Sequence, residues 1–258
     1  MCEKLNRFGL SVFKVALTSA LCLFGLLSMI YVAFTTNEMF SYFYCLATVG
    51  FVALPLVMSI LFRWRMNLPF YLLFTFYALG PILGAVYNLY YYTAWWDDLL
   101  HLLAGTVFAI VGAQLTYVFN KNNKTSYVLA AVFGVLLSMG VAVLWECFEY
   151  FSDVLIHSDM QADTIINTIY TKIGRNDGLA DVYENITNTA INGQPLGING
   201  YLDIGLVDTM GDMIAETLGA VIFLVYVLFD RNRHPFIVSC TKEHNCLARP
   251  IIFKKRHI

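Results

Sequence analysis

Residues 127–148 read YVLAAVFGVLLSMGVAVLWECF, and they contain one charged residue, Glu146, close to the end of the stretch. A helix needs roughly 20 apolar residues to cross the hydrocarbon core of a bilayer. This stretch therefore predicts a transmembrane helix that carries a carboxylate near its C-terminal end.

Similar apolar stretches occur on both sides of it. The chain is 59% hydrophobic and 13% charged, and its mean hydropathy of +0.64 excludes an ordinary soluble domain. We expect an all-α polytopic membrane protein whose transmembrane domain covers residues 1–230, followed by a basic cytoplasmic tail at 231–258. The six predicted spans lie near residues 15–34, 39–62, 70–90, 99–119, 127–148 and 207–228.

The distribution of Lys and Arg predicts the orientation of these spans. All of these residues except Lys172 and Arg175 fall before span 1, between spans 2 and 3, between spans 4 and 5, or after span 6. Positive residues concentrate on the cytoplasmic side of membrane proteins. We therefore expect both termini in the cytoplasm, and a multi-pass protein of the plasma membrane.

One long loop, at residues 151–206, connects spans 5 and 6 on the extracytoplasmic side. Asp159 to Ile173 has the spacing of a short amphipathic helix. The Gly-rich stretch from Gly193 to Gly205 is typical of turns. A loop of this length in a compact protein is more often a lid or a binding loop than a spacer.

Span 3 contains Gly80 and Gly84 at four-residue spacing, with Pro81 between them. Small residues at this spacing let helix backbones approach closely, and proline bends a helix. We therefore interpret the pattern as packing. Aromatic residues follow where span 3 leaves the bilayer, which is typical of an interfacial belt. They are Tyr90, Tyr91, Tyr92, Trp95 and Trp96.

Ionisable residues gather at three helix ends that meet the outer face of the membrane, whereas the apolar cores of spans 1 to 3 have no acidic residue. Within each helix end, the spacing of three or four places these side chains on one face. The residues are Asp97, Asp98 and His101 in span 4, Glu146, Glu149 and Asp153 in span 5, and Asp208, Asp212 and Glu216 in span 6.

A carboxylate inside a bilayer costs a few kcal/mol, so such residues usually pair, face the bundle interior or bind a cation. Protonation, pairing with Lys172 or Arg175, or a bound divalent metal would each relieve the cost. Carboxylates with one imidazole suit Mg, Mn, Fe or Zn. The predicted ligands are Glu146, Glu149, Asp208, Asp212 and His101.

Some members of the group have other expected roles. Asp97 lies one turn from His101 and would orient it. Asp98 and Asp153 fit solvated helix ends better than ligation. Glu216 lies deeper, where either a proton relay or a simple hydrogen bond would account for it.

These residues carry a resemblance to the YjdF-like family of uncharacterised bacterial inner-membrane proteins. Three blocks are similar: Trp96 to His101 followed by Gly105, Leu144 to Glu149, and Gly205 to Asp212. The loop residues Asp159 to Gln161 also resemble the family. The similarity runs over residues 40–228 and implies the same fold without implying a reaction. Position by position, it marks Asp97, His101, Glu146, Glu149, Asp208 and Asp212.

The leading functional hypothesis is a metal-dependent enzyme that acts on a lipid or lipid-linked substrate near the outer face, with His101 and Asp97 as catalytic residues. The alternatives are an ion- or proton-coupled transporter and a noncatalytic membrane interaction partner. The sequence lacks a Gly-x-Ser-x-Gly elbow, a Walker loop and a His-Glu-x-x-His pair. Scattered basic residues and a formal net charge of -2 do not favour nucleic-acid binding.

Overall fold

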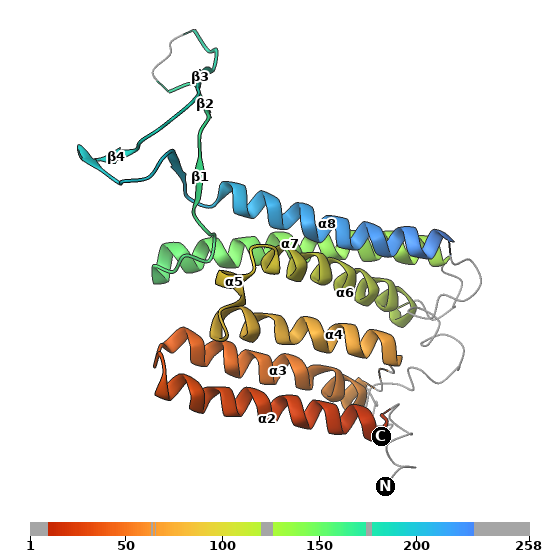
Figure 1. The fold of residues 1–258 in the computed structure, drawn as a ribbon. Helices are drawn as coiled ribbons and strands as arrows, with labels where there is room; N and C mark the ends of the chain where they lie inside the picture. The colour runs from red at the N-terminus through yellow and green to blue at the C-terminus, as the bar shows by residue number, and fades with distance from the viewer. Residues whose placement is uncertain (1–9, 63, 65, 120–125, 174–176, 230–258) are drawn as a thin grey trace, which may run out of the picture. The chain divides into compact units, whose positions relative to one another are not determined.

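The computed structural model describes residues 10–62, 64, 66–119, 126–173 and 177–229. Six helices within these ranges are long and apolar enough to cross a membrane. The prediction of an all-α polytopic fold is therefore confirmed, and the largest difference in a span boundary is at the end of α7. The six are α2 (Val12–Phe34), α3 (Met39–Phe62), α4 (Leu68–Pro81) with its continuation η1 (Ile82–Val86), α6 (Trp96–Phe119), α7 (Tyr127–Ile156) and α8 (Leu206–Phe229) (Figure 1).

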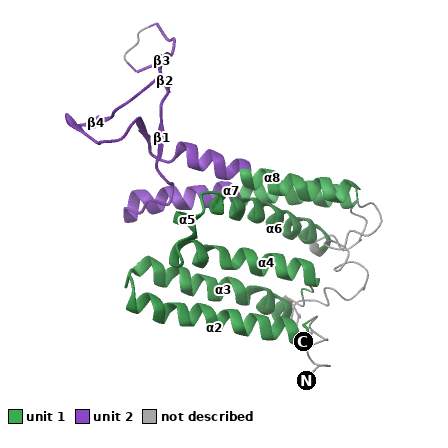
Figure 2. Ribbon diagram, viewed as in Figure 1, with its two compact units in different colours: residues 1–141, 215–258 green, residues 142–214 purple. Residues whose placement is uncertain are grey.

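The chain divides into two compact units, shown in Figure 2. Unit 1 comprises residues 1–141 and 215–258, and unit 2 comprises residues 142–214. Unit 2 therefore holds the C-terminal part of α7, the long loop and the first turns of α8. The predicted basic tail at 231–258 lies outside the described residues, and the prediction of a single transmembrane domain stays a prediction.

In unit 1, helices α2, α3, α4 and α6 pack side by side in this order (Figure 1). Large side chains of α4, among them Phe70 and Tyr71, are fully buried in the same core as small side chains of α6 such as Ala109 and Ala113. Large residues against small ones let neighbouring backbones approach each other, which is how membrane helices gain packing contacts without a hydrophobic driving force.

Glycines place α6 very close to α7 and α8 within unit 1. A Cβ added at Gly105 would overlap the backbone carbonyl of Glu216, and one at Gly219 would overlap that of Leu102. On the α7 side, a Cβ at Gly134 would overlap the carbonyl of Ala109. Only glycine fits at these three crossing points, so the sequence itself sets the distance between the helices.

The prediction for span 3 is confirmed, because the helix changes form directly after Pro81. Residues Ile82–Val86 form a π-helical turn that the N–H of Tyr87 closes by donating to the carbonyl of Ile82 at 3.3 Å. A Cβ at Gly80 would overlap Leu100 of α6, and one at Gly84 would overlap Tyr90, whose helix is α5 (Leu89–Tyr92). Both glycines therefore serve close packing.

The loop of unit 2 forms short antiparallel strand pairs, so the predicted amphipathic helix over Asp159 to Ile173 is wrong. The segment is rich in Ile and Thr, whose β-branched side chains lose rotamer freedom in a helix and fit a strand. The pairs are β1 (Thr164–Ile166) with β6 (Tyr201–Asp203), β2 (Ile169–Thr171) with β3 (Asp181–Tyr183), and β4 (Ala190–Ile191) with β5 (Gln194–Pro195).

The expected turns in the Gly-rich part of the loop are present. Asn192 and Gly193 connect β4 to β5 and have φ values of 54° and 79°. Positive φ at both central residues is the geometry that favours Asn-Gly in a tight hairpin. Gly205, with φ of 109°, leads from β6 into α8.

Candidate metal centre

The C-terminal part of α7 presents two buried carboxylates. Glu146 and Glu149 are 7% and 6% exposed, and their spacing of three places them on the same face of the helix. The neighbouring residues Leu144 and Phe148 are exposed apolar side chains, as expected for a surface that faces lipid. The helix therefore turns its acidic residues inward and its apolar residues outward.

A third carboxylate, Asp212, joins them from α8 and is 4% exposed. One ligand atom from each of Glu146, Glu149 and Asp212 can be chosen so that all three lie within 4.8 Å of one another. Two oxygens bound to one Mg²⁺ or Ca²⁺ ion at about 2.1–2.5 Å are at most about 5 Å apart. The three carboxylates of unit 2 are therefore close enough to share a cation.

The hydrogen bonding of the two glutamates also fits a cation. Oε2 of Glu146 and Oε2 of Glu149 are buried and accept no hydrogen bond from the described residues, although both side chains have other interactions. A buried carboxylate oxygen normally accepts a hydrogen bond or binds a positive charge. Three carboxylates form an oxygen-only donor set, which hard cations such as Mg²⁺, Mn²⁺ and Ca²⁺ prefer.

Asp208 is predicted as a ligand, but it lies outside this group of three. Its Oδ2 accepts the backbone N–H of Ala162 at 2.8 Å, and the neighbouring Thr209 hydroxyl pairs with the Gln161 amide at 2.5 Å. Both contacts attach the start of the loop to the first turn of α8. A role of Asp208 as a metal ligand stays a prediction.

Asp153 has a comparable role at the end of α7. Its carboxylate accepts hydrogen bonds from the Ser158 hydroxyl at 2.7 Å and from the backbone N–H groups of Met160 and Gln161 at 2.7 and 2.8 Å. Asp153 belongs to no group that could hold a metal among the described residues. This arrangement agrees with the helix-end role that its position in the sequence favours.

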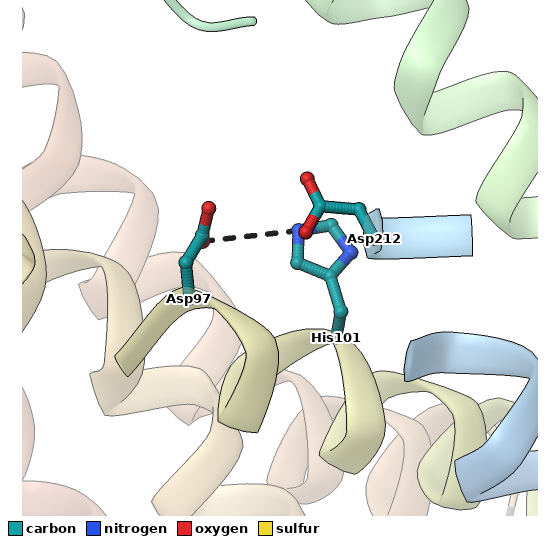
Figure 3. Close-up of side chains that lie close together, drawn as sticks. All are labelled: Asp97, His101 and Asp212. Atoms are coloured by element: carbon teal, nitrogen blue, oxygen red, sulfur yellow. Dashed lines mark ion pairs between the residues drawn. The ribbon is translucent and has the colours of Figure 1, made fainter. Parts of the chain in front are cut away.

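Unit 1 contains the predicted aspartate and histidine pair. Asp97 Oδ1 lies 3.8 Å from His101 Nε2, one turn apart on α6 (Figure 3). The distance is within ion-pair range and longer than a hydrogen bond. The His101 side chain is 9% exposed and that of Asp97 is 41% exposed, so the carboxylate lies nearer to the surface. Asp98 follows in the first turn of the same helix, and its side chain is exposed.

Glu216 of unit 1 is almost fully buried. A side chain that the sequence analysis did not identify contacts it. The Ser138 hydroxyl of α7 lies 3.2 Å from Glu216 Oε1. A single serine in an apolar helix has no distinctive spacing, so sequence patterns could not identify it. Its importance follows only from the packing of α7 against α8.

Comparison with known protein families identifies the family of this chain. A family model described as "Predicted membrane protein (DUF2238)" matches residues 17–233, which is more than half of the chain. The chain belongs to this family. Membership in the DUF2238 family is consistent with the YjdF-like resemblance and with an integral membrane protein. Comparison with curated proteins and with solved structures gave no significant match.

Proposed function

We propose that this DUF2238 protein is a metal-dependent membrane enzyme that acts on a lipid or lipid-linked substrate near the outer face of the membrane. Its divalent cation would bind to Glu146, Glu149 and Asp212 of unit 2. The observation that carries the proposal is the grouping of these three buried carboxylates within 4.8 Å.

The energetic argument starts from the cost of burying like charges together. One carboxylate in a membrane helix costs about 2.5–3.5 kcal/mol on insertion scales. Three of them close together add mutual repulsion, which a bound divalent cation would offset directly. A group this costly in two membrane helices is consistent with a functional site.

Bound there, a divalent cation would lower the pKa of a coordinated water or polarise a phosphoryl or acyl oxygen. Three protein ligands leave coordination positions for water and substrate. In unit 1, His101 would act as a general base, and Asp97, one turn away, would orient it. Asp208 would contribute by holding the loop against the first turn of α8.

The proposed substrate class follows from where the site lies along the helices. Glu146 and Glu149 are in the last turns of α7, and Asp212 is in the second turn of α8, where both helices approach the extracytoplasmic loop. In unit 1, Tyr91, Tyr92 and Trp95 are 84%, 74% and 60% exposed at the predicted interfacial level. A lipid headgroup is the natural substrate for a site near the membrane surface.

Metal binding is tested first, because it needs no knowledge of the reaction. Purified full-length protein would be equilibrated with Mg²⁺, Mn²⁺, Fe²⁺ or Zn²⁺, and the bound metal would be measured by mass spectrometry. Loss of a residue that only supports a metal ligand lowers metal affinity by roughly 10–100-fold. We expect Glu149→Gln, which alters a ligand itself, to lower the affinity by at least as much.

The matched control is Glu184→Gln, the same substitution at an exposed glutamate in the loop, which should leave metal binding unchanged. If wild type and Glu149→Gln bound equally little of every metal, the metal centre would be refuted.

Catalysis is tested separately with membrane lipid extracts, in which products would be sought by mass spectrometry. Product should depend on added metal and be lost with a chelator, with Glu149→Gln and with His101→Ala. Substrate uptake into proteoliposomes without any product would instead support a transporter.

A further inference from the structure

Glu216 is the most completely buried carboxyl group among the described residues, with 2% exposure. It lies on α8 where the helix crosses α6 at Gly105, and a Cβ at Gly105 would already overlap the backbone of Glu216. Gly219, one turn later, meets α6 just as closely. The backbone at Glu216 is therefore fixed against α6, and the side chain cannot reach lipid or water without separating the two helices.

The second observation is the geometry of Ser138. Its Oγ lies 3.2 Å from Glu216 Oε1 and 3.2 Å from the carbonyl oxygen of Gly105. A serine hydroxyl has one proton to donate and two lone pairs to accept. If Glu216 were a carboxylate, Ser138 would be placed between two acceptors and could satisfy only one of them.

A protonated Glu216 resolves this conflict. Its carboxylic acid can donate to Ser138 Oγ, and the Ser138 proton is then available for the carbonyl of Gly105. All three groups then take part in a single chain of hydrogen bonds across α8, α7 and α6.

The other ionisable groups of unit 1 on neighbouring helices are consistent with a neutral Glu216. Tyr77 of α4 is a phenol, which is uncharged at neutral pH and cannot neutralise a carboxylate. On α6, His101 lies one turn before Gly105 and is paired with Asp97. The Lys14 ammonium donates to the carbonyl of Met66 at 2.5 Å. Burial in an apolar bundle favours the uncharged form of a carboxyl group.

We propose that Glu216 is a proton-binding site of this protein, whose carboxyl group is protonated at neutral pH and donates to Ser138. A neutral carboxyl inside a helix bundle is the kind of group through which membrane proteins bind and release protons. The site lies within unit 1 and requires no metal, so it goes beyond the metal centre of unit 2 and does not depend on it.

The test is infrared difference spectroscopy on the purified full-length protein at pH 7, comparing wild type with Glu216→Gln. The carbonyl stretch of a protonated carboxylic acid is separate from the carboxylate bands. We expect the substitution to remove one protonated-carboxyl band, which in wild type should shift in D₂O. Ser138→Ala should move the band because the hydrogen bond is lost, and Ser138→Thr should retain it.

Glu216→Gln should fold, since the amide N–H can still donate to Ser138, and its metal binding should match that of wild type. The control is Asp98→Asn at an exposed position, which should remove carboxylate bands only. If Glu216→Gln also removed only carboxylate bands, Glu216 would be ionised and the proposal would be overturned.

Discussion

At the scale of single residues, the clearest prediction concerns Gly105 on α6. Replacing it with alanine would drive a Cβ into the carbonyl of Glu216, a backbone atom that cannot turn aside. Overpacking of this kind typically destabilises by about 1–3 kcal/mol. We expect Gly105→Ala to lower the free energy of unfolding by this amount, measured by denaturant titration in detergent micelles.

Gly140 on α7 is the matched control, since no atom lies within 4 Å of a Cβ added there. Gly140→Ala should be neutral or slightly stabilising, because alanine favours a helix over glycine by about 1 kcal/mol. Equal losses in the two variants would show that glycine matters for helix flexibility and not for the close approach of α6 and α8.

The residue scale also shows how much of the site the sequence could predict. Glu146 and Glu149 share a face because they are three apart on one helix, which is a local property. Asp208 and Asp212 share a face of α8 and lie one turn apart, so the level along α8 at which the two glutamates lie decides that Asp212 and not Asp208 is within reach of them. Ser138 became a candidate only once α7 was seen beside α8.

At the scale of elements, Asp153 links the end of α7 to the start of the loop. It accepts two backbone N–H groups and one hydroxyl, and hydrogen bonds to a charged group are worth about 1.5–3 kcal/mol each. Asp153→Ala should release this segment, so the amides of Met160 and Gln161 should exchange hydrogen at least about tenfold faster, by mass spectrometry.

Asp163→Ala is the control for the loop, because Asp163 is exposed and the N–H groups of Met160 and Gln161 donate to Asp153 instead. It should leave the exchange rates of both amides unchanged. If Asp153→Ala behaved in the same way, the loop would be held by its strand pairs alone.

The loop is also the element for which the sequence prediction failed. Residues Asp159 to Ile173 show an amphipathic spacing, yet Thr164–Ile166 pairs with Tyr201–Asp203 from the other end of the loop. Strand pairing depends on a partner far away in the chain, and a local pattern has no information about it. The hairpin at Asn192 and Gly193 was predictable, because its turn is encoded within two residues.

At the scale of the whole molecule, the distribution of Lys and Arg predicts both termini in the cytoplasm and the loop outside. In a cysteine-free background, Glu184→Cys in the loop should react with a membrane-impermeant maleimide in intact cells. Asn122→Cys, between spans 4 and 5, should react only after the cells are permeabilised. The opposite pattern would invert the topology.

The sequence alone determined the class of this protein, its six spans and the three helix ends on which the ionisable residues lie, because hydropathy and helical spacing act over neighbouring residues. Tertiary structure decided which of those side chains meet. It grouped Glu146 and Glu149 with Asp212, used Asp208 and Asp153 to hold the loop, and placed Ser138 against Glu216. The physical reason is that the rotation and the spacing of packed helices follow from contacts, such as those at Gly105 and Gly219, between residues distant in the chain.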